Sequence, residues 1–150
     1  MIRSLARPLG LLALAACGSG VVSGSGRPSA QQFTREVRAV PARLVQAAVT
    51  TFGRYGIPIA EADEPGGRVR TMPANLRALA RRFDEAPLSC PQGTPRATSV
   101  PVRFDVRVRR TNDGSALSIE TQREGDSGCV VRAAFVSTLL DEIARAAGDS

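Results

Sequence analysis

Histidine, lysine and tryptophan are absent from the 150-residue sequence, and only three cysteines are present. Without histidine or lysine, the chain has no Ser-His or Ser-Lys pair for nucleophilic catalysis. A zinc site would also lack its usual nitrogen ligands. We therefore expect a non-catalytic protein with no metal and no cofactor, and the composition leaves open only a small hydrolase that works with carboxylates alone.

Aromatic side chains are also scarce, with five Phe and one Tyr. They are too few to form the stacking platforms of a nucleic-acid-binding surface, so nucleic acid is not an expected partner. The 20 basic residues are all arginines, against 14 acidic residues, which gives a formal charge of +6. A moderate positive charge favours anionic head groups or acidic protein surfaces as partners.

The N-terminal residues 1–16 have the organisation of a signal peptide. Arg3 and Arg7 make its start positive, and residues 9–16 form an apolar run. This run is too short to remain in a bilayer as a membrane-spanning helix, but it has the length of a signal segment. We expect residues 1–16 to be removed after export.

The stretch Leu14-Ala15-Ala16-Cys17 resembles the lipobox of bacterial lipoproteins. The resemblance implies that the signal Leu14, Ala15 and Ala16 directs cleavage before Cys17, which carries a diacylglyceryl group and often a third acyl chain. Two or more acyl chains anchor a protein stably to a membrane. Gly18 in place of an aspartate implies placement at the outer membrane, facing the periplasm, in an organism with two membranes. A plain secretory signal with a free cysteine is the alternative.

The remaining chain divides into a tether and one domain. Residues 17–31 begin with the expected lipidated cysteine and are rich in Gly and Ser, the composition of a flexible linker. Residues 32–148 are long enough for a single domain with one core. Its two cysteines, Cys90 and Cys129, predict a disulfide in an exported chain, with two independent thiols as the alternative. Closing a loop of roughly 40 residues stabilises a domain by about 4 kcal/mol.

Two segments near the start of the domain show different periodicities. Residues 33–39 alternate between apolar and polar side chains, which predicts a half-buried strand with Arg35 on its apolar side. Apolar residues then recur every three or four positions, which predicts a helix that begins at Pro41 and ends at Gly56. The apolar stripe of this helix consists of Leu44, Val45, Ala48, Val49 and Phe52.

Residues 57–63 and 68–71 predict a β-hairpin with a Glu-Pro-Gly-Gly turn. Glu61, Asp63 and Glu64 form the densest acidic group of the domain. They lack the ligand spacing of a calcium loop. We therefore expect a solvated hairpin tip instead of a metal site.

The middle of the domain is less regular. Residues 75–85 predict a short amphipathic helix. Residues 87–101 contain four prolines and Cys90. A connection of this length needs a restraint within a compact domain, so we expect the disulfide to hold it in place.

Residues 100–109 have the clearest strand pattern in the chain, with Val and Phe on one face and charged residues on the other. An Asn-Asp-Gly turn leads to residues 116–123, which alternate in the same way. The short connection predicts a β-hairpin.

The polar face of this hairpin is the candidate binding surface. Arg103, Arg107 and Arg109 should all point from it towards solvent. We expect Glu120 to lie opposite one of these arginines and to neutralise part of their charge. Partly paired surface charge is the alternative to a phosphate or lipid site.

Residues 130–147 predict a last amphipathic helix, capped by Ser127 or Asp126. Its expected apolar face consists of Phe135, Val136, Leu139, Leu140, Ile143 and Ala146. The element order is then β-α-β-β-(short α)-β-β-α. Alternating strands and amphipathic helices predict an α+β two-layer sandwich, with a largely antiparallel sheet and helices on one face.

The stretch Gly125-Asp126-Ser127-Gly128 spells the tetrapeptide around the nucleophile of chymotrypsin-like serine proteases. That chemistry needs a base beside the serine, and the chain has no histidine. The domain is also too short for two β-barrels. We interpret the stretch as a capping turn that carries Cys129.

With these elements in place, the domain resembles the BamC-like helix-grip lipoproteins, accessory subunits of the outer-membrane β-barrel assembly machinery. The matching features are the strand before Pro41, the helix after it, Gly56-Ile57-Pro58-Ile59, the hairpin at Gly67, and the late strand pair with its final helix. The chain departs from that family in having one domain and a short Gly/Ser tether. The resemblance implies an envelope protein and no catalytic residue.

These observations predict a membrane-anchored, non-catalytic envelope lipoprotein that binds a protein partner or acts as an assembly scaffold. A carrier that holds a lipid or another amphiphile between sheet and helices is the alternative. The oligomeric state is left open by the sequence.

Overall fold

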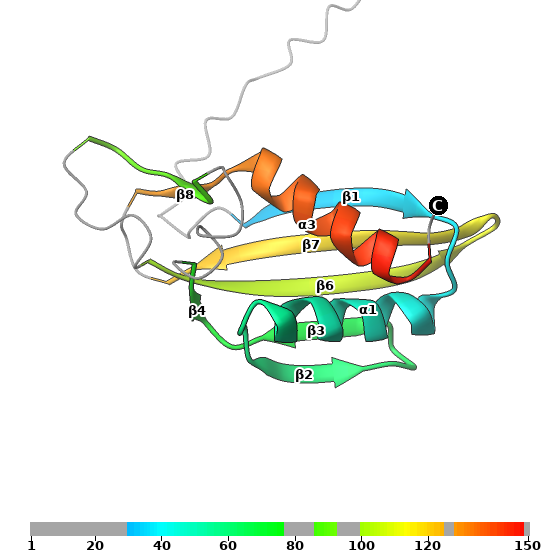
Figure 1. The fold of residues 1–150 in the computed structure, drawn as a ribbon. Helices are drawn as coiled ribbons and strands as arrows, with labels where there is room; N and C mark the ends of the chain where they lie inside the picture. Colours follow the sequence, from blue (N-terminus) through cyan, green and yellow to red (C-terminus); the bar gives the residue numbers. More distant parts are fainter. Residues whose placement is uncertain (1–29, 77–85, 93–99, 125–127, 149–150) are drawn as a thin grey trace, which may run out of the picture.

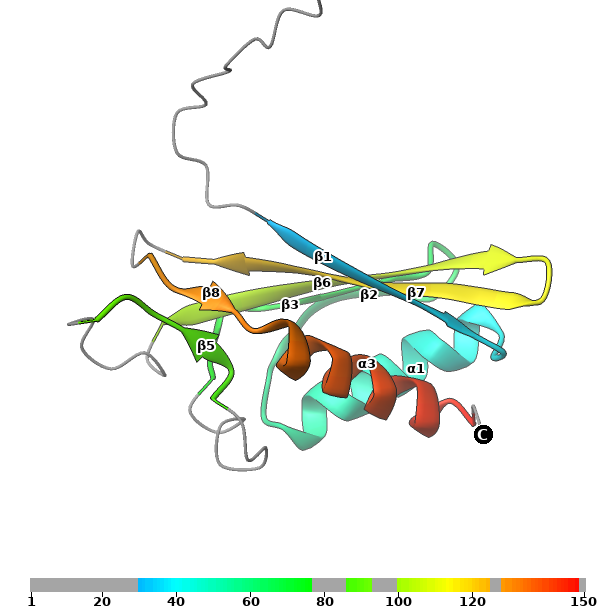
Figure 2. The same ribbon diagram turned by 90° about the horizontal axis from the view of Figure 1, so that it is seen from above.

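Two helices pack against one face of an antiparallel sheet in the computed structural model (Figure 1). They are α1 (Pro41–Arg54) and α3 (Ala133–Ala146). The structure describes residues 30–76, 86–92, 100–124 and 128–148. Figure 2 shows both helices on the same side of the larger sheet. The α+β sandwich with helices on one face is therefore confirmed.

The strands form one large and one small sheet. They are β1 (Gln31–Val37), β2 (Ile59–Asp63), β3 (Arg68–Thr71), β4 (Ala74–Asn75), β5 (Leu88–Ser89), β6 (Pro101–Thr111), β7 (Gly114–Arg123) and β8 (Val130–Val131). The order in the large sheet is β1-β7-β6-β3-β2, and β4 also pairs with β6. Every pairing is antiparallel, and β5 and β8 form the small sheet. β6 thus pairs with three other strands and is the centre of the sheet.

The inner face of the large sheet, which faces the helices, follows from the period-2 alternation of β6 and β7. Apolar side chains on this face meet the apolar stripes of both helices, and the rings of Phe52 and Phe104 lie 5.5 Å apart between their centroids. The largest fully buried side chains include Leu44, Val45, Phe52, Val69, Phe104, Leu117, Ile119, Phe135, Leu139 and Ile143. Their burial supplies the main favourable term for folding.

The end of α1 matches its sequence signal. Gly56 has a φ of +71°, and its N–H donates to the carbonyl of Gly53 at 3.0 Å. The N–H of Ile57 donates to the carbonyl of Phe52 at 2.9 Å. This pair of bonds is a Schellman cap, in which glycine takes the left-handed position and the next apolar residue packs back on the helix. Ile57 is buried, as expected.

The expected disulfide between Cys90 and Cys129 is present, with a Cα–Cα distance of 4.0 Å. It extends the β5–β8 ladder, in which Leu88 lies opposite Val131 and Ser89 opposite Val130. The bond therefore joins the next opposed pair of an antiparallel ladder, where Cα atoms are close together. It ties the segment around β5 to the segment that leads into α3.

Three details predicted for the last helix are wrong. The last helix begins at Ala133, because Val130 and Val131 form β8. Its N-cap is Arg132, which makes no side-chain capping bond, so the capping role expected of residues 126 or 127 does not hold. Ala146 is exposed instead of buried.

The predicted helix at 75–85 is tested only at its start. Asn75 belongs to β4, which pairs with β6 through Ala74 opposite Val102, so a helical start at Asn75 is wrong. Residues 77–85 lie outside the described part of the chain. Within the expected irregular connection at 87–101, the structure adds the short strand β5.

Alanine at Gly53 and at Gly56 should change stability in opposite directions. An added Cβ meets no atom within 4 Å at either position. Gly53 is helical, where alanine is favoured by about 0.5–1 kcal/mol, so Gly53→Ala should raise the free energy of unfolding. Gly56→Ala should lower it by about 1 kcal/mol, because a side chain disfavours the left-handed conformation. Urea denaturation measures both, and changes of the same sign would contradict the assigned cap.

Candidate functional site

The candidate site is the outer face of the large sheet, which is the face opposite α1 and α3 (Figure 2). Residues that lie opposite each other in an antiparallel pair point to the same face. The β3–β6 register places Arg68 opposite Arg107, and Arg70 opposite Asp105. Alternate residues of β6 continue this face in both directions. The arginines on it, termed the arginine face, are Arg68, Arg70, Arg103, Arg107 and Arg109.

Asp105 lies at the centre of the arginine face. Only 7% of its side chain is exposed, although it is on the face without helices. Arg68 donates to both carboxylate oxygens, from Nε to Oδ1 at 3.1 Å and from Nη2 to Oδ2. The Nε of Arg107 is 3.7 Å from Oδ1, and the Nε of Arg70 is 4.0 Å from Oδ2. Three guanidinium groups therefore cover and neutralise one carboxylate.

This arrangement sets the charge state of Asp105. Burial alone would raise the pKa of the carboxyl group, because desolvation disfavours its charged form. The hydrogen bonds and charge of Arg68, with the charges of Arg107 and Arg70, more than offset the effect of burial and hold the pKa of Asp105 below its ordinary value. The hydrogen bond to Asp105, together with its charge, raises the pKa of Arg68. The group is ionised throughout the neutral pH range.

The structure places the three arginines singled out in the sequence on one face. Arg103 has its Nη2 3.4 Å from Oε1 of Glu124, and both side chains are well exposed, so this ion pair contributes little stability. Arg107 contacts Asp105. Arg109 is exposed near the end of β6. Their role as a binding surface stays a prediction.

The sequence interpretation missed the contribution of β3. Arg68 and Arg70 complete the arginine face, and the alternating Arg-Val-Arg-Thr at 68–71 is the signal that places them there. The expectation for Glu120 is wrong, because the register puts it opposite Asp105 and not opposite an arginine. The side-chain amide of Gln122 donates to Glu120 at 3.0 Å instead.

The acidic residues of the β2–β3 hairpin bind separate neighbours. Glu61 has its Oε2 3.4 Å from Nη2 of Arg70. Asp63 accepts a hydrogen bond from a turn N–H at 3.0 Å, and Glu64 accepts one from the Gln46 amide at 2.9 Å. Across the described residues, no three His, Cys, Asp or Glu side chains are grouped so that they could hold a metal ion.

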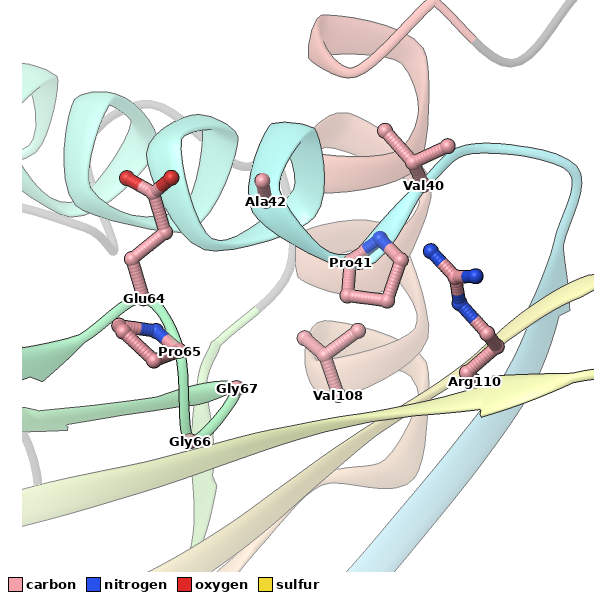
Figure 3. A pocket seen from close by; sticks show the side chains of 9 residues that line it. All are labelled: Val40, Pro41, Ala42, Glu64, Pro65, Gly66, Gly67, Val108 and Arg110. Carbon is pink, nitrogen blue, oxygen red and sulfur yellow. The ribbon is translucent and has the colours of Figure 1, made fainter.

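A groove of about 610 Å³ lies between the start of α1, the β2–β3 turn and β6 (Figure 3). Among the described residues that line it, Glu64 and Arg110 are charged, and Val40, Pro41 and Val108 supply apolar surface between them. Within the part of the chain that the structure describes, none of the residues that line it is a Ser, Thr, Tyr or Cys.

Several residues of the sequence interpretation lie outside the described part of the chain. These are Cys17, the cleavage residues Leu14, Ala15 and Ala16, and residues 125–127 of the protease-like tetrapeptide. Lipidation and cleavage therefore stay predictions. Among the described residues, no helix has both the length and the apolar character needed to span a bilayer.

The stability conferred by Asp105 should disappear in acid. Because its pKa is lower in the folded chain than in the unfolded chain, its stabilisation is complete above the unfolded value of about 3.9. It is lost as the pH falls through the lower folded value. Asp105→Asn should lower the free energy of unfolding by about 2 kcal/mol at pH 7, and this difference should shrink below about pH 4.

Urea denaturation as a function of pH measures the effect of Asp105→Asn. Asp113→Asn is the matched control, because Asp113 is an exposed aspartate in the turn between β6 and β7. A difference between Asp105→Asn and the parent that stays constant down to pH 2 would argue against ion pairing as the source of the stability.

Comparisons with known proteins give little further guidance. No protein-family model and no curated protein matches this chain. Among solved structures, the chain is similar to an X-ray structure of a protein from Chromobacterium violaceum. The match has 15% sequence identity and a TM-score of 0.41, and it covers 79% of this chain and 96% of that one. A similarity at this level carries no argument about function.

Proposed function

We propose that this chain is a lipid-anchored envelope protein whose domain binds an acidic surface of a protein partner without catalysing a reaction. The observation that carries the proposal is the sheet face opposite the helices. This face bears five arginines, three of which contact one buried carboxylate. Cationic side chains on an accessible face favour an acidic partner through charge complementarity.

The positive charge of the arginine face is concentrated on β3 and β6, and Glu61, Glu120 and Glu36 lie at neighbouring positions of the same sheet face. Arg68 is bound to Asp105, which Arg107 also contacts. Arg70 and Arg103 contact carboxylates that are themselves about half exposed, so those exposed pairs are weak. Guanidinium groups are weakly hydrated and bind carboxylates in a bidentate geometry, which suits them to protein interfaces.

The packing of the core favours a docking domain over the alternative of a lipid carrier. A carrier needs space for an acyl chain between sheet and helices. The rings of Phe52 and Phe104 lie 5.5 Å apart in that layer, and Phe52, Phe104 and Phe135 are each at most 1% exposed. The groove in Figure 3 lies at the edge of this layer and carries charged side chains.

The proposed anchor comes from the sequence around Cys17. The lipobox and the Gly/Ser tether would hold the domain near the periplasmic face of the outer membrane. β1 begins at Gln31, so the tether leads directly into the edge of the large sheet. A tethered domain meets its partner at a raised local concentration, which suits a weak electrostatic contact.

Charge reversal on the arginine face should abolish partner binding while the fold is kept. We suggest Arg103→Glu with Arg109→Glu, since Arg103 makes only an exposed ion pair and Arg109 is exposed. Arg107 is left unchanged, because a carboxylate in its place would face Asp105. In-cell crosslinking followed by mass spectrometry should lose its partner bands in this variant.

Arg43→Glu with Arg54→Glu provides the control, because it changes the net charge by the same amount. Both are exposed arginines of α1, in the layer that covers the opposite face of the sheet. The control should leave crosslinking unchanged. Unchanged crosslinking of the sheet variant would exclude the arginine face as the docking surface, and equal losses in both variants would show a dependence on net charge alone.

Replacement of the expected lipidated residue tests the anchor separately. Cys17→Ser should move the protein from the membrane fraction to the soluble fraction, because no acyl chain can then be attached. Membrane fractionation and an intact mass measure this directly. A Cys17→Ser chain that stays in the membrane fraction would overturn the proposed anchor without bearing on the arginine face.

A further inference from the structure

β1 has one free edge. It ends the strand order β1-β7-β6-β3-β2, and no strand of the described residues pairs with its side away from β7. An edge strand presents unpaired backbone N–H and C=O groups, which can pair with a strand of another chain. The edge at β1 is therefore a surface that can accept a further strand.

The two edges of the large sheet differ in their protection. β2 has an irregular register between Ile59 and Glu61 and carries Glu61 and Asp63. Bulges and like charges of this kind keep an edge from pairing with another copy. β1 pairs with β7 over all seven residues without a register shift. It carries one Arg35 and one Glu36, so it has no net charge.

We infer that β1 pairs antiparallel with β1 of a second copy of this chain, with the two-fold axis at Thr34. Thr34 is the midpoint of β1, so this register overlaps the whole strand. Residues whose numbers are equally distant from 34 then lie opposite each other. The resulting pairs are Gln31 with Val37, Gln32 with Glu36, Phe33 with Arg35, and Thr34 with itself.

These pairs are chemically complementary. The Gln32 amide can donate to the Glu36 carboxylate of the other copy, and the two Thr34 hydroxyls can bond each other. Arg35 lies opposite Phe33, where a guanidinium is attracted to an aromatic ring. An ion pair with Asp141 of α3 already orients Arg35 on the helix side of the sheet.

Other registers are less favourable. An axis at Arg35 would place two arginines opposite each other, and an axis at Glu36 would place two carboxylates opposite each other. Repulsion between like charges disfavours both registers. An axis at Phe33 would avoid this repulsion but would leave Glu36 and Val37 without partners. The Thr34 axis is the register that pairs the full strand with no like charges.

This pairing has a consequence for the shape of the assembly. Opposed residues share a face, so the helices of both copies lie on one side and both arginine faces lie on the other. The two large sheets become one continuous sheet with the polar side chains of β1 at its centre. The assembly would present two docking faces in one plane and could bind a repeated or extended acidic partner with avidity. The pairing itself depends on β1 alone, not on the proposed docking function.

Single cysteine substitutions in the full chain test the register. Thr34→Cys should form a disulfide-linked dimer under mild oxidation, because opposed Cα atoms lie about 4.5–5.5 Å apart, within disulfide range. Gln32→Cys and Glu36→Cys should not crosslink alone, because their symmetry mates are four residues out of register, about 13 Å along the strand. Co-expression of these two variants with different tags should give a mixed dimer. The parent chain controls for its own cysteines on the same non-reducing gel.

The outcomes of this experiment separate the possibilities. A Thr34→Cys dimer with unlinked Gln32→Cys and Glu36→Cys supports the two-fold at Thr34. Equal crosslinking of all three variants would indicate random collision and overturn the register. A Thr34→Cys chain that stays monomeric, or that links to a different protein, would overturn pairing with a second copy.

Charge substitutions provide a test without disulfides. Gln32→Arg should strengthen self-association, because each introduced arginine then faces Glu36 of the other copy. Adding Glu36→Arg should weaken it by about fivefold to tenfold relative to the single variant, because two pairs of like charges then oppose each other. Gln32 lies opposite Glu120, and Glu36 lies opposite Ala116 within the chain, so neither change places like charges together inside one copy.

Sedimentation of the full chain in detergent measures the dissociation constant, and circular dichroism checks the fold. The expected result is a gain with Gln32→Arg that the second substitution reverses. Equal dissociation constants for the parent and both variants, or a gain in both variants, would overturn the inferred pairing.

Discussion

The rest of the structure depends on the two-sided character of β6. Its inner side chains, among them Val102, Phe104 and Val106, are fully buried against the helix layer. Its backbone pairs with β7, β3 and β4. Because side chains alternate between the two faces, any shift of β6 by one residue would bury charges and expose valines. The register of the whole sheet is therefore fixed by the hydrophobic face of one strand.

The same constraint determines the chemistry of the outer face. No described helix covers it (Figure 2), so the residues between the buried valines and phenylalanine must satisfy one another or water. The Asp105 carboxylate accepts hydrogen bonds from Arg68 of the same sheet. Its side chain is therefore buried although no described helix covers this face. A carboxylate removed from water needs such partners. The neighbouring arginines remain accessible for an external contact, which is the basis of the docking proposal.

The sequence predicted the features that depend on residues close together in the chain and missed those that depend on residues far apart. The stripe of α1, its Schellman cap at Gly56 and the β6–β7 hairpin are local patterns, and the structure confirms them. The disulfide followed from cysteine number and the predicted export.

The Arg68–Asp105 pair spans 37 positions. It depends on strand order, which no periodicity within one segment specifies. The same holds for β5 and β8, each two residues long. The β8 pairing also explains why α3 begins at Ala133 and not near Val130.

The two sheet edges differ in regularity and charge because different connections lead into them. β2 and β3 are joined by a tight turn, in which Gly67 has a φ of +65° and its carbonyl accepts from the N–H of Val108 at 2.7 Å. A Cβ there would lie 2.3 Å from the Val108 carbonyl oxygen, so the turn is held against β6 and orients an irregular, acidic edge. β1 instead follows the N-terminal segment, pairs with β7, and forms an ion pair from its Arg35 to Asp141 of α3. It lacks the turn and bulge that protect β2. A regular edge strand without net charge is a site for strand pairing unless charge, a bulge or a covering segment protects it. The charge of Arg35 is paired with that of Asp141, so it repels another strand only weakly. Pairing with a second strand therefore explains the regular edge at β1 better than charge repulsion does.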